Sequence, residues 1–285
     1  MKMKTFLLVL AMLPSAASAS PVDCYPAAKP LTNYPPLLCS GAETTAPAGC
    51  FTAAKAETNT DYPALLCSGA SSNAPVDCWK AAKGVTNFPA LLCARAASNA
   101  PITCFSSAKN VTDYPALLCS GAGSSAPILC FSAAKSVTNY PAMLCAGAAS
   151  DAPVSCFAAA KGLTDYPALL CSGATSNAPI DCFRAAKALT QFPALLCSGA
   201  KDNAPISCFN AAKGLTDNPA ILCSPNGALK AVTREDIDQS WKLPYPMRFP
   251  NPYPFRYPFP DLNRDPSKPP TNPNQPNPAN VFAGN

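Results

Sequence analysis

The positions of the cysteines constrain this chain more than any other feature of its sequence. The intervals between successive cysteines alternate between a long one, as from Cys24 to Cys39, and a short one, as from Cys39 to Cys50, and only the interval from Cys50 to Cys67 is extended. The pattern repeats every ~26 residues through eight units, and a period of this size is typical of stacked-repeat proteins. The cysteines are Cys24, Cys39, Cys50, Cys67, Cys78, Cys93, Cys104, Cys119, Cys130, Cys145, Cys156, Cys171, Cys182, Cys197, Cys208 and Cys223.

Each unit is predicted to form two short helices of about two to three turns each, which would be marginal alone. Both begin with a capping residue, any residue and then proline, as in Asn177-Ala178-Pro179 and Asp165-Tyr166-Pro167. The glycine of the recurring Ser-Gly-Ala suits a left-handed cap at the end of the second helix. The expected N-caps are Thr45, Asn73, Asn99, Ser125, Asp151, Asn177 and Asn203 for the first helices, and Asn33, Asp61, Asn87, Asp113, Asn139, Asp165, Gln191 and Asp217 for the second.

Apolar side chains recur at fixed positions of the unit. An aromatic residue follows the first cysteine of every unit, and a second aromatic precedes the second proline in seven of the eight. One hairpin of this length cannot bury a core alone, so neighbouring units must bury these faces between them. The sequence therefore predicts an all-α solenoid of eight disulfide-stapled hairpins over residues 20–223, extended as a quasi-one-dimensional rod.

The cysteine spacing favours structural disulfides. Even the closest cysteines, such as Cys39 and Cys50, are well separated in the sequence, whereas zinc and iron–sulfur sites use close pairs and redox motifs use Cys-x-x-Cys. Two pairings remain open, one within units (Cys24–Cys39 and onward) and one between units (Cys39–Cys50 and onward). We favour pairing within units, because the shifted scheme leaves Cys24 and Cys223 without partners.

Residues 1–19 are predicted to be a signal peptide. Lys2 and Lys4 precede the apolar run 5–13, and Ala17-Ser18-Ala19 forms a cleavage site before Ser20. No later run is long and apolar enough to be expected to span a membrane. We therefore expect export to an oxidising space, either periplasmic or outside the cell, where paired cysteines persist.

The composition excludes several catalytic classes. The chain contains no histidine, so it cannot form Ser-His-Asp or Cys-His machinery by itself. Its net charge of +5 is small and dispersed, which argues against nucleic acid as a partner. No catalytic residue, metal site or cofactor is predicted.

A lysine stands five residues after the first cysteine of every unit. This row could track an anionic polymer of the cell envelope. Alternatively, each lysine could complement the end of its helix and pair with an aspartate at the next cap, and the near balance of acidic residues favours this second interpretation. The lysines are Lys29, Lys55, Lys83, Lys109, Lys135, Lys161, Lys187 and Lys213.

The repeats end at Cys223. Residues 224–242 are predicted to form a turn and a short helix, with Ile237 and Trp241 covering the exposed end of the last unit. Residues 243–285 are predicted to be an extended or disordered tail, acting either as a spacer or as a docking segment for a partner. The candidate partner-binding residues are Tyr245, Arg248, Phe249, Tyr253, Phe255, Arg256, Tyr257 and Phe259.

The segment Leu170 to Phe183, with Leu-Cys-Ser-Gly-Ala followed by Ala-Pro-x-x-Cys-Phe, resembles cysteine-rich repeat proteins exported by Gram-negative bacteria. The resemblance extends over residues 21–223 and transfers no activity and no functional residue. The sequence therefore favours a non-enzymatic exported structural or binding module, whose partner is a protein or an anionic envelope polymer. Two alternatives remain open: a periplasmic thiol-redox or soft-metal-binding protein, and a secreted inhibitor or toxin.

Overall fold

The computed structural model describes residues 20–57 and 62–226, and it divides the chain into two units, residues 1–229 and 230–285. All described residues belong to the first unit, where they form helices and no strand. The helices are α1 (Pro21–Ala28), α2 (Pro35–Leu38), α3 (Ala46–Ala56), α4 (Pro63–Leu66), α5 (Ala74–Ala82), α6 (Pro89–Cys93), α7 (Ala100–Ala108), α8 (Pro115–Leu118), α9 (Ala126–Ala134), α10 (Pro141–Leu144), α11 (Ala152–Ala160), α12 (Pro167–Leu170), α13 (Ala178–Ala186), α14 (Pro193–Leu196), α15 (Ala204–Ala212) and α16 (Pro219–Cys223).

The predicted all-α hairpin repeat is confirmed, but the two helices of each unit differ in length. The odd-numbered helices have 8 to 11 residues, whereas the even-numbered helices have only 4 or 5. The second helices are therefore shorter than expected. They end early because the glycine of Ser-Gly-Ala, such as Gly173 at φ +63°, turns the chain into the left-handed region two residues after the second cysteine.

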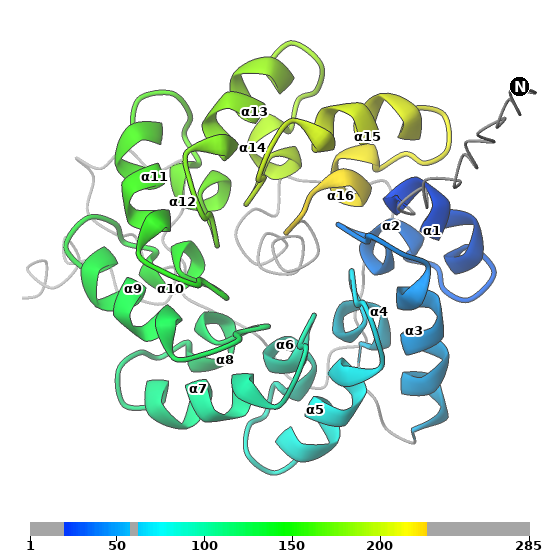
Figure 1. Cartoon of the computed structure of the whole chain (residues 1–285), viewed down its shortest axis with the longest axis horizontal. Helices are drawn as coiled ribbons and strands as arrows, with labels where there is room; N and C mark the ends of the chain where they lie inside the picture. The colour runs from blue at the N-terminus through cyan, green and yellow to red at the C-terminus, as the bar shows by residue number, and fades with distance from the viewer. Residues whose placement is uncertain (1–19, 58–61, 227–285) are drawn as a thin grey trace, which may run out of the picture. The chain divides into compact units, whose positions relative to one another are not determined.

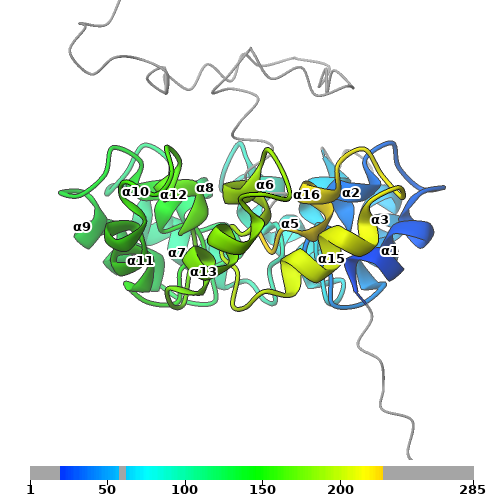
Figure 2. The same cartoon turned by 90° about the horizontal axis from the view of Figure 1, so that it is seen from above.

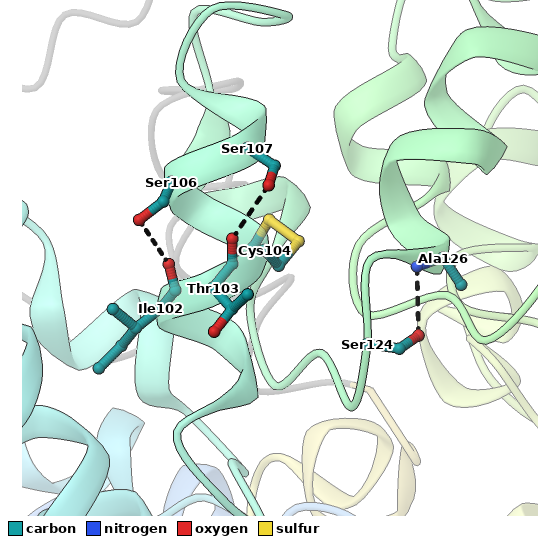
Figure 3. The surroundings of a disulfide bond; sticks show 8 residues. Ile102, Thr103, Cys104, Ser106, Ser107, Ser124 and Ala126 are labelled. Atoms are coloured by element: carbon teal, nitrogen blue, oxygen red, sulfur yellow. Dashed lines mark hydrogen bonds between the residues drawn. A yellow bond between two sulfur atoms is a disulfide. The ribbon is translucent and has the colours of Figure 1, made fainter.

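Eight disulfides join the two helices of each hairpin, so pairing within units is confirmed. They run from Cys24–Cys39 to Cys208–Cys223, with Cα–Cα distances of 5.5 to 5.6 Å. None of the sixteen cysteines is free. Eight disulfides fit an oxidising location, which agrees with the expected export. Figure 3 shows the disulfide of Cys104 beside the hydroxyl groups of Ser106 and Ser107, which donate to main-chain carbonyls one helical turn earlier.

The eight hairpins close into a ring, so the expected rod is wrong (Figure 1). The last helix, α16, packs against α2, and α1 packs against α15 and α16. The N–H of Gly41 in the first unit donates to the carbonyl of Leu222 in the eighth at 3.3 Å. Equivalent bonds, such as Gly69 to Leu38 at 2.9 Å, link six other pairs of neighbouring units. The eighth unit has Pro225 at this position, which has no N–H to donate.

The wedge shape of each hairpin explains the closure. The short even-numbered helices form the inner layer of the ring and the longer odd-numbered helices form the outer layer (Figure 1). Glycine turns of minimal side-chain volume let the inner backbones approach to hydrogen-bonding distance. The rotation between each hairpin and the next then brings the eighth unit beside the first. Because the ring closes, the first unit covers the end of the last unit, which residues 224–242 were expected to cover. Residues 227–242 lie outside the described residues.

The core runs between the two layers of the ring. The leucine before the second cysteine of each unit is fully buried, with 0% exposure at all eight positions from Leu38 to Leu222. The aromatic residue after the first cysteine is buried in six units, whereas Tyr25 and Phe105 are half-buried. The second aromatic row, which includes Tyr34 and Tyr166, is half-buried, so it is less completely part of the core than expected.

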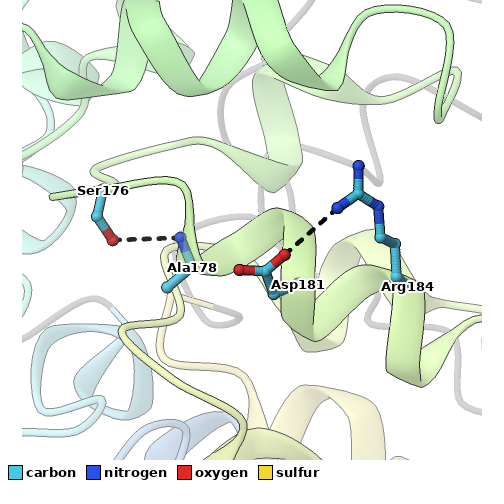
Figure 4. Close-up of polar contacts among 4 residues, drawn as sticks. All are labelled: Ser176, Ala178, Asp181 and Arg184. Atoms are coloured by element: carbon cyan, nitrogen blue, oxygen red, sulfur yellow. Dashed lines mark hydrogen bonds and ion pairs between the residues drawn. The ribbon is translucent and has the colours of Figure 1, made fainter.

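The helix caps differ from the expected ones. The expected residues do occupy the N-cap positions of the odd-numbered helices from α3 onward, but their side chains accept no capping hydrogen bond. The residue before each one accepts it instead, as Ser176 does from the N–H of Ala178 at 3.2 Å (Figure 4). The even-numbered helices have an aromatic residue or Asn218 at the N-cap, so the caps expected there are wrong; Asp61 lies outside the described residues.

Candidate functional site: the lysine turns

The turn that follows each odd-numbered helix presents the most regular exposed surface of the ring. We call these segments the lysine turns. They begin at the lysine of each unit and end before the proline of the next helix, and residues 58–61 of the second turn lie outside the described part of the chain. The lysine turns are residues 29–34, 55–62, 83–88, 109–114, 135–140, 161–166, 187–192 and 213–218.

Local hydrogen bonds hold the lysine turns in one conformation. In the sixth turn, the N–H of Leu163 donates to the carbonyl of Ala160 at 3.0 Å. Further along, the N–H of Tyr166 donates to the Thr164 hydroxyl at 3.2 Å, and the same threonine contact recurs in seven units. In these seven units the threonine hydroxyl therefore satisfies the main-chain N–H of the residue before the proline.

Every lysine of the row is exposed. Five of them lie over the aromatic ring one helical turn earlier, and the shortest distance is 3.8 Å from Lys83 Nζ to the Trp79 ring centroid. Among the described residues, ion pairs join only Lys80 to Glu57 and Arg184 to Asp181, and Figure 4 shows the second of these. The expected pairing of the row with aspartates at the next cap is therefore not found there.

Apolar side chains are exposed beside these lysines. In every turn except the second, the third residue is leucine or valine, and in five turns it is at least 36% exposed. These five residues make up all but one of the large exposed apolar side chains in the described ring, the other being Leu129 at 74% in α9. The exposure is therefore patterned rather than scattered. The five residues are Val85, Val111, Leu163, Leu189 and Leu215.

The positive charge of the ring is concentrated in the lysine turns. They carry eight lysines and five carboxylates, for a net charge of +3. The rest of residues 20–226 carries four basic and six acidic residues, for a net charge of −2. The ring is nearly neutral as a whole, but its charge is unevenly distributed. The carboxylates in the turns are Glu57, Asp61, Asp113, Asp165 and Asp217.

No protein-family model, no curated protein and no solved structure matches this chain. The resemblance to exported cysteine-rich repeat proteins therefore stays a prediction. Within residues 20–57 and 62–226, no cluster of three or more cysteine, aspartate or glutamate residues could hold a metal ion. The helices described for this chain are all too short or too polar to cross a bilayer. The candidate partner-binding residues from Tyr245 to Phe259 lie outside the described residues.

A second polar cluster, which the sequence analysis missed, lies on the inside of the ring. Arg95 takes the place of the repeated glycine in the third unit and adopts the same left-handed conformation, at φ +62°. Its guanidinium group donates to the carbonyl of Pro225 and, at 3.3 Å, to Oδ1 of Asn226. Asn226 in turn donates to the carbonyl of Ser172 at 2.9 Å. The sequence signal was the substitution itself, because Arg95 and Pro225 stand where the other six units have glycine.

The surroundings of Arg95 indicate a structural role. A Cβ atom added to Gly41 or Gly69 would lie 2.9 to 3.0 Å from the Arg95 guanidinium, so the side chain fits only because glycines line its path. Burial lowers the pKa of Arg95 to about 10, and the negative charge of Glu43 acts in the opposite direction. The group therefore remains charged at neutral pH and ties together the third and eighth units.

Proposed function

We propose that this chain is an exported, non-enzymatic binding scaffold whose ring displays the lysine turns to an anionic partner at the cell envelope or outside the cell. The observation that supports this is a recurrent pattern around a closed ring: an exposed lysine begins every turn, and leucine or valine stands third in seven of the eight, exposed in five. Repeated weak contacts on one body produce strong overall binding, because each engaged turn raises the effective concentration of the others.

The rigidity of the ring supports the same proposal. A disulfide joins the two helices that flank each lysine turn, and all of these cysteines except Cys208 are buried in the core. In the chain-entropy model, each bridge of this loop size contributes about 3 kcal/mol to stability. Turns held in place before binding lose little conformational freedom when a partner engages them, so more of the contact energy appears as affinity.

The state of the cysteines favours a scaffold over the thiol-redox and soft-metal alternatives. All sixteen are paired, and fifteen of them are at most 3% exposed, whereas Cys208 is half-buried. Thiol chemistry needs an accessible thiolate, and a buried disulfide offers none. The predicted signal peptide and the eight disulfides support export, and the choice between the periplasm and the cell exterior remains part of this proposal.

Retention on immobilised dextran sulfate tests the proposed function. The full chain is expected to bind and to elute with rising salt, because the contact is electrostatic. A variant with Lys161, Lys187 and Lys213 replaced by glutamine should elute at a clearly lower salt concentration than the wild type. A control variant with Lys80, Arg184 and Lys201 replaced by glutamine loses the same charge elsewhere and should elute close to the wild type.

Two outcomes would overturn the proposal. The first is that the wild-type chain does not bind dextran sulfate. The second is that the control variant loses as much retention as the lysine-turn variant, which would show that binding depends on net charge alone. All variants should first show unchanged helical circular dichroism and no free thiols.

A further inference from the structure

The lysine turns are coplanar because the ring closes. A solenoid with a pitch would move each unit along the axis, and its last unit could not pack beside its first. Here the Gly41–Leu222 bond repeats the contact that joins the other neighbours, such as Gly147 to Leu118. Equivalent positions therefore lie on one circle in one plane. Figure 2 shows the turns after α13 and α15 rising along the same margin of the ring.

Most lysine turns combine three kinds of side chain that suit a lipid–water interface, although the second turn lacks the leucine or valine and the eighth lacks the aromatic residue. The lysine supplies positive charge on a long apolar stem, as Lys161 does over the ring of Phe157 at 5.1 Å. Two residues later, the exposed leucine or valine offers an apolar side chain, as Leu163 does. The half-buried aromatic residue at the end of most turns, such as Tyr166, is of the type enriched at membrane interfaces.

We propose that the ring binds flat on an anionic lipid bilayer, with the lysine turns against the headgroups and their leucine and valine side chains inserted among them. This inference rests on the proposed function and names its ligand class. A soluble polyanion would need only the lysines, whereas a bilayer also accounts for the apolar residues exposed beside them. A flat lipid surface can contact all the coplanar turns at once.

The distribution of charge gives the orientation. The lysine turns carry +3, and the remainder of residues 20–226 carries −2. An anionic surface therefore attracts one margin of the ring and repels the rest. The exposed Leu129 belongs to the outer helix α9 and not to a lysine turn, so we assign it no part in the proposed contact.

Vesicle flotation with the full chain tests this inference. Vesicles of phosphatidylcholine with phosphatidylglycerol should carry the protein upward, and vesicles of phosphatidylcholine alone should not. Replacing Leu163, Leu189 and Leu215 with serine keeps every charge and should lower the partition coefficient at least about tenfold, since three apolar contacts are lost. Leu129→Ser is the matched control and should float like the wild type.

The outcomes separate this inference from the proposed function. If the triple serine variant floats as well as the wild type, or if the wild-type chain ignores anionic vesicles, the bilayer inference is overturned. Retention of the wild type and the triple serine variant on dextran sulfate would then leave the scaffold proposal standing. If the wild-type chain binds neither vesicles nor dextran sulfate, both proposals fail.

Discussion

Arg95 donates a hydrogen bond to the carbonyl oxygen of Pro225, which lies 130 residues later in the chain. The bond joins the third unit to the end of the eighth across the inside of the ring. Arg95 and Pro225 are the two residues that replace the repeated glycine at this position of the unit. The two exceptions to the repeat therefore contact each other, and together they complete the inner layer of the closed ring.

Arg95→Ala is expected to lower the free energy of unfolding by about 2 kcal/mol, because Pro225 and Asn226 lose a charged donor. Arg184→Ala removes an exposed arginine whose partner Asp181 lies at 3.4 Å, and it should cost no more than about 0.5 kcal/mol. Urea unfolding with disulfides intact measures both. Equal losses for the two variants would show that Arg95 does not hold the ring together.

Glycine substitutions should separate backbone strain from contact between units. Gly162 has φ +80° and nothing within 4 Å of an added Cβ, so Gly162→Ala should cost only strain, about 1 kcal/mol. Gly147 has φ +64°, and an added Cβ would lie 2.8 Å from the carbonyl oxygen of Ser120 in the preceding unit. Gly147→Ala should therefore cost clearly more.

Gly123→Ala serves as the control for these two variants, because Gly123 has no positive φ and no neighbour within 4 Å. Thermal unfolding should place it near the wild type. If Gly147→Ala were no more destabilising than Gly162→Ala, the close approach of neighbouring units at the glycine turns would be contradicted.

Tryptic digestion of the unfolded, unreduced chain reports the disulfide pairing. With bridges within units, cuts after the lysines of the row leave adjacent units linked, whereas Arg95 and Lys201 lie between units and release them. We expect three bridged species: one ending at Arg95, one spanning 96–201 and one beginning at Asp202. Many small, internally bridged peptides in the mass spectrum would indicate pairing between units instead.

The sequence was enough to predict the hairpin and its disulfide, because both follow from local spacing. Alanine-rich segments after a proline favour helix, and an array that begins with Cys24 and ends with Cys223 leaves no cysteine over when each unit pairs its own two. The lysine row was also visible as a feature. Its apolar companions, such as Leu215, were not singled out, because an isolated leucine in a sequence does not reveal whether neighbouring units cover it.

Ring closure could not be predicted from the same pattern. A rod and a ring differ in the small rotation between neighbouring units, and that rotation depends on how closely backbones such as those of Gly69 and Leu38 approach. The helix caps could not be predicted from the sequence pattern either. The prolines indicated correctly where each helix begins, but the free N–H groups there donate to Ser176 and Thr164 and not to the expected Asn177 and Asp165.

The distance between Lys29 and Lys213 tests ring closure most directly. Spin labels on non-natural amino acids at these exposed positions, read by pulsed electron resonance, would be compared with the neighbouring pair Lys187–Lys213 and the opposite pair Lys29–Lys135. A closed ring predicts that Lys29–Lys213 matches the neighbouring pair and is shorter than Lys29–Lys135, because α1 packs against α15. A Lys29–Lys213 distance that is the longest of the three would contradict the ring.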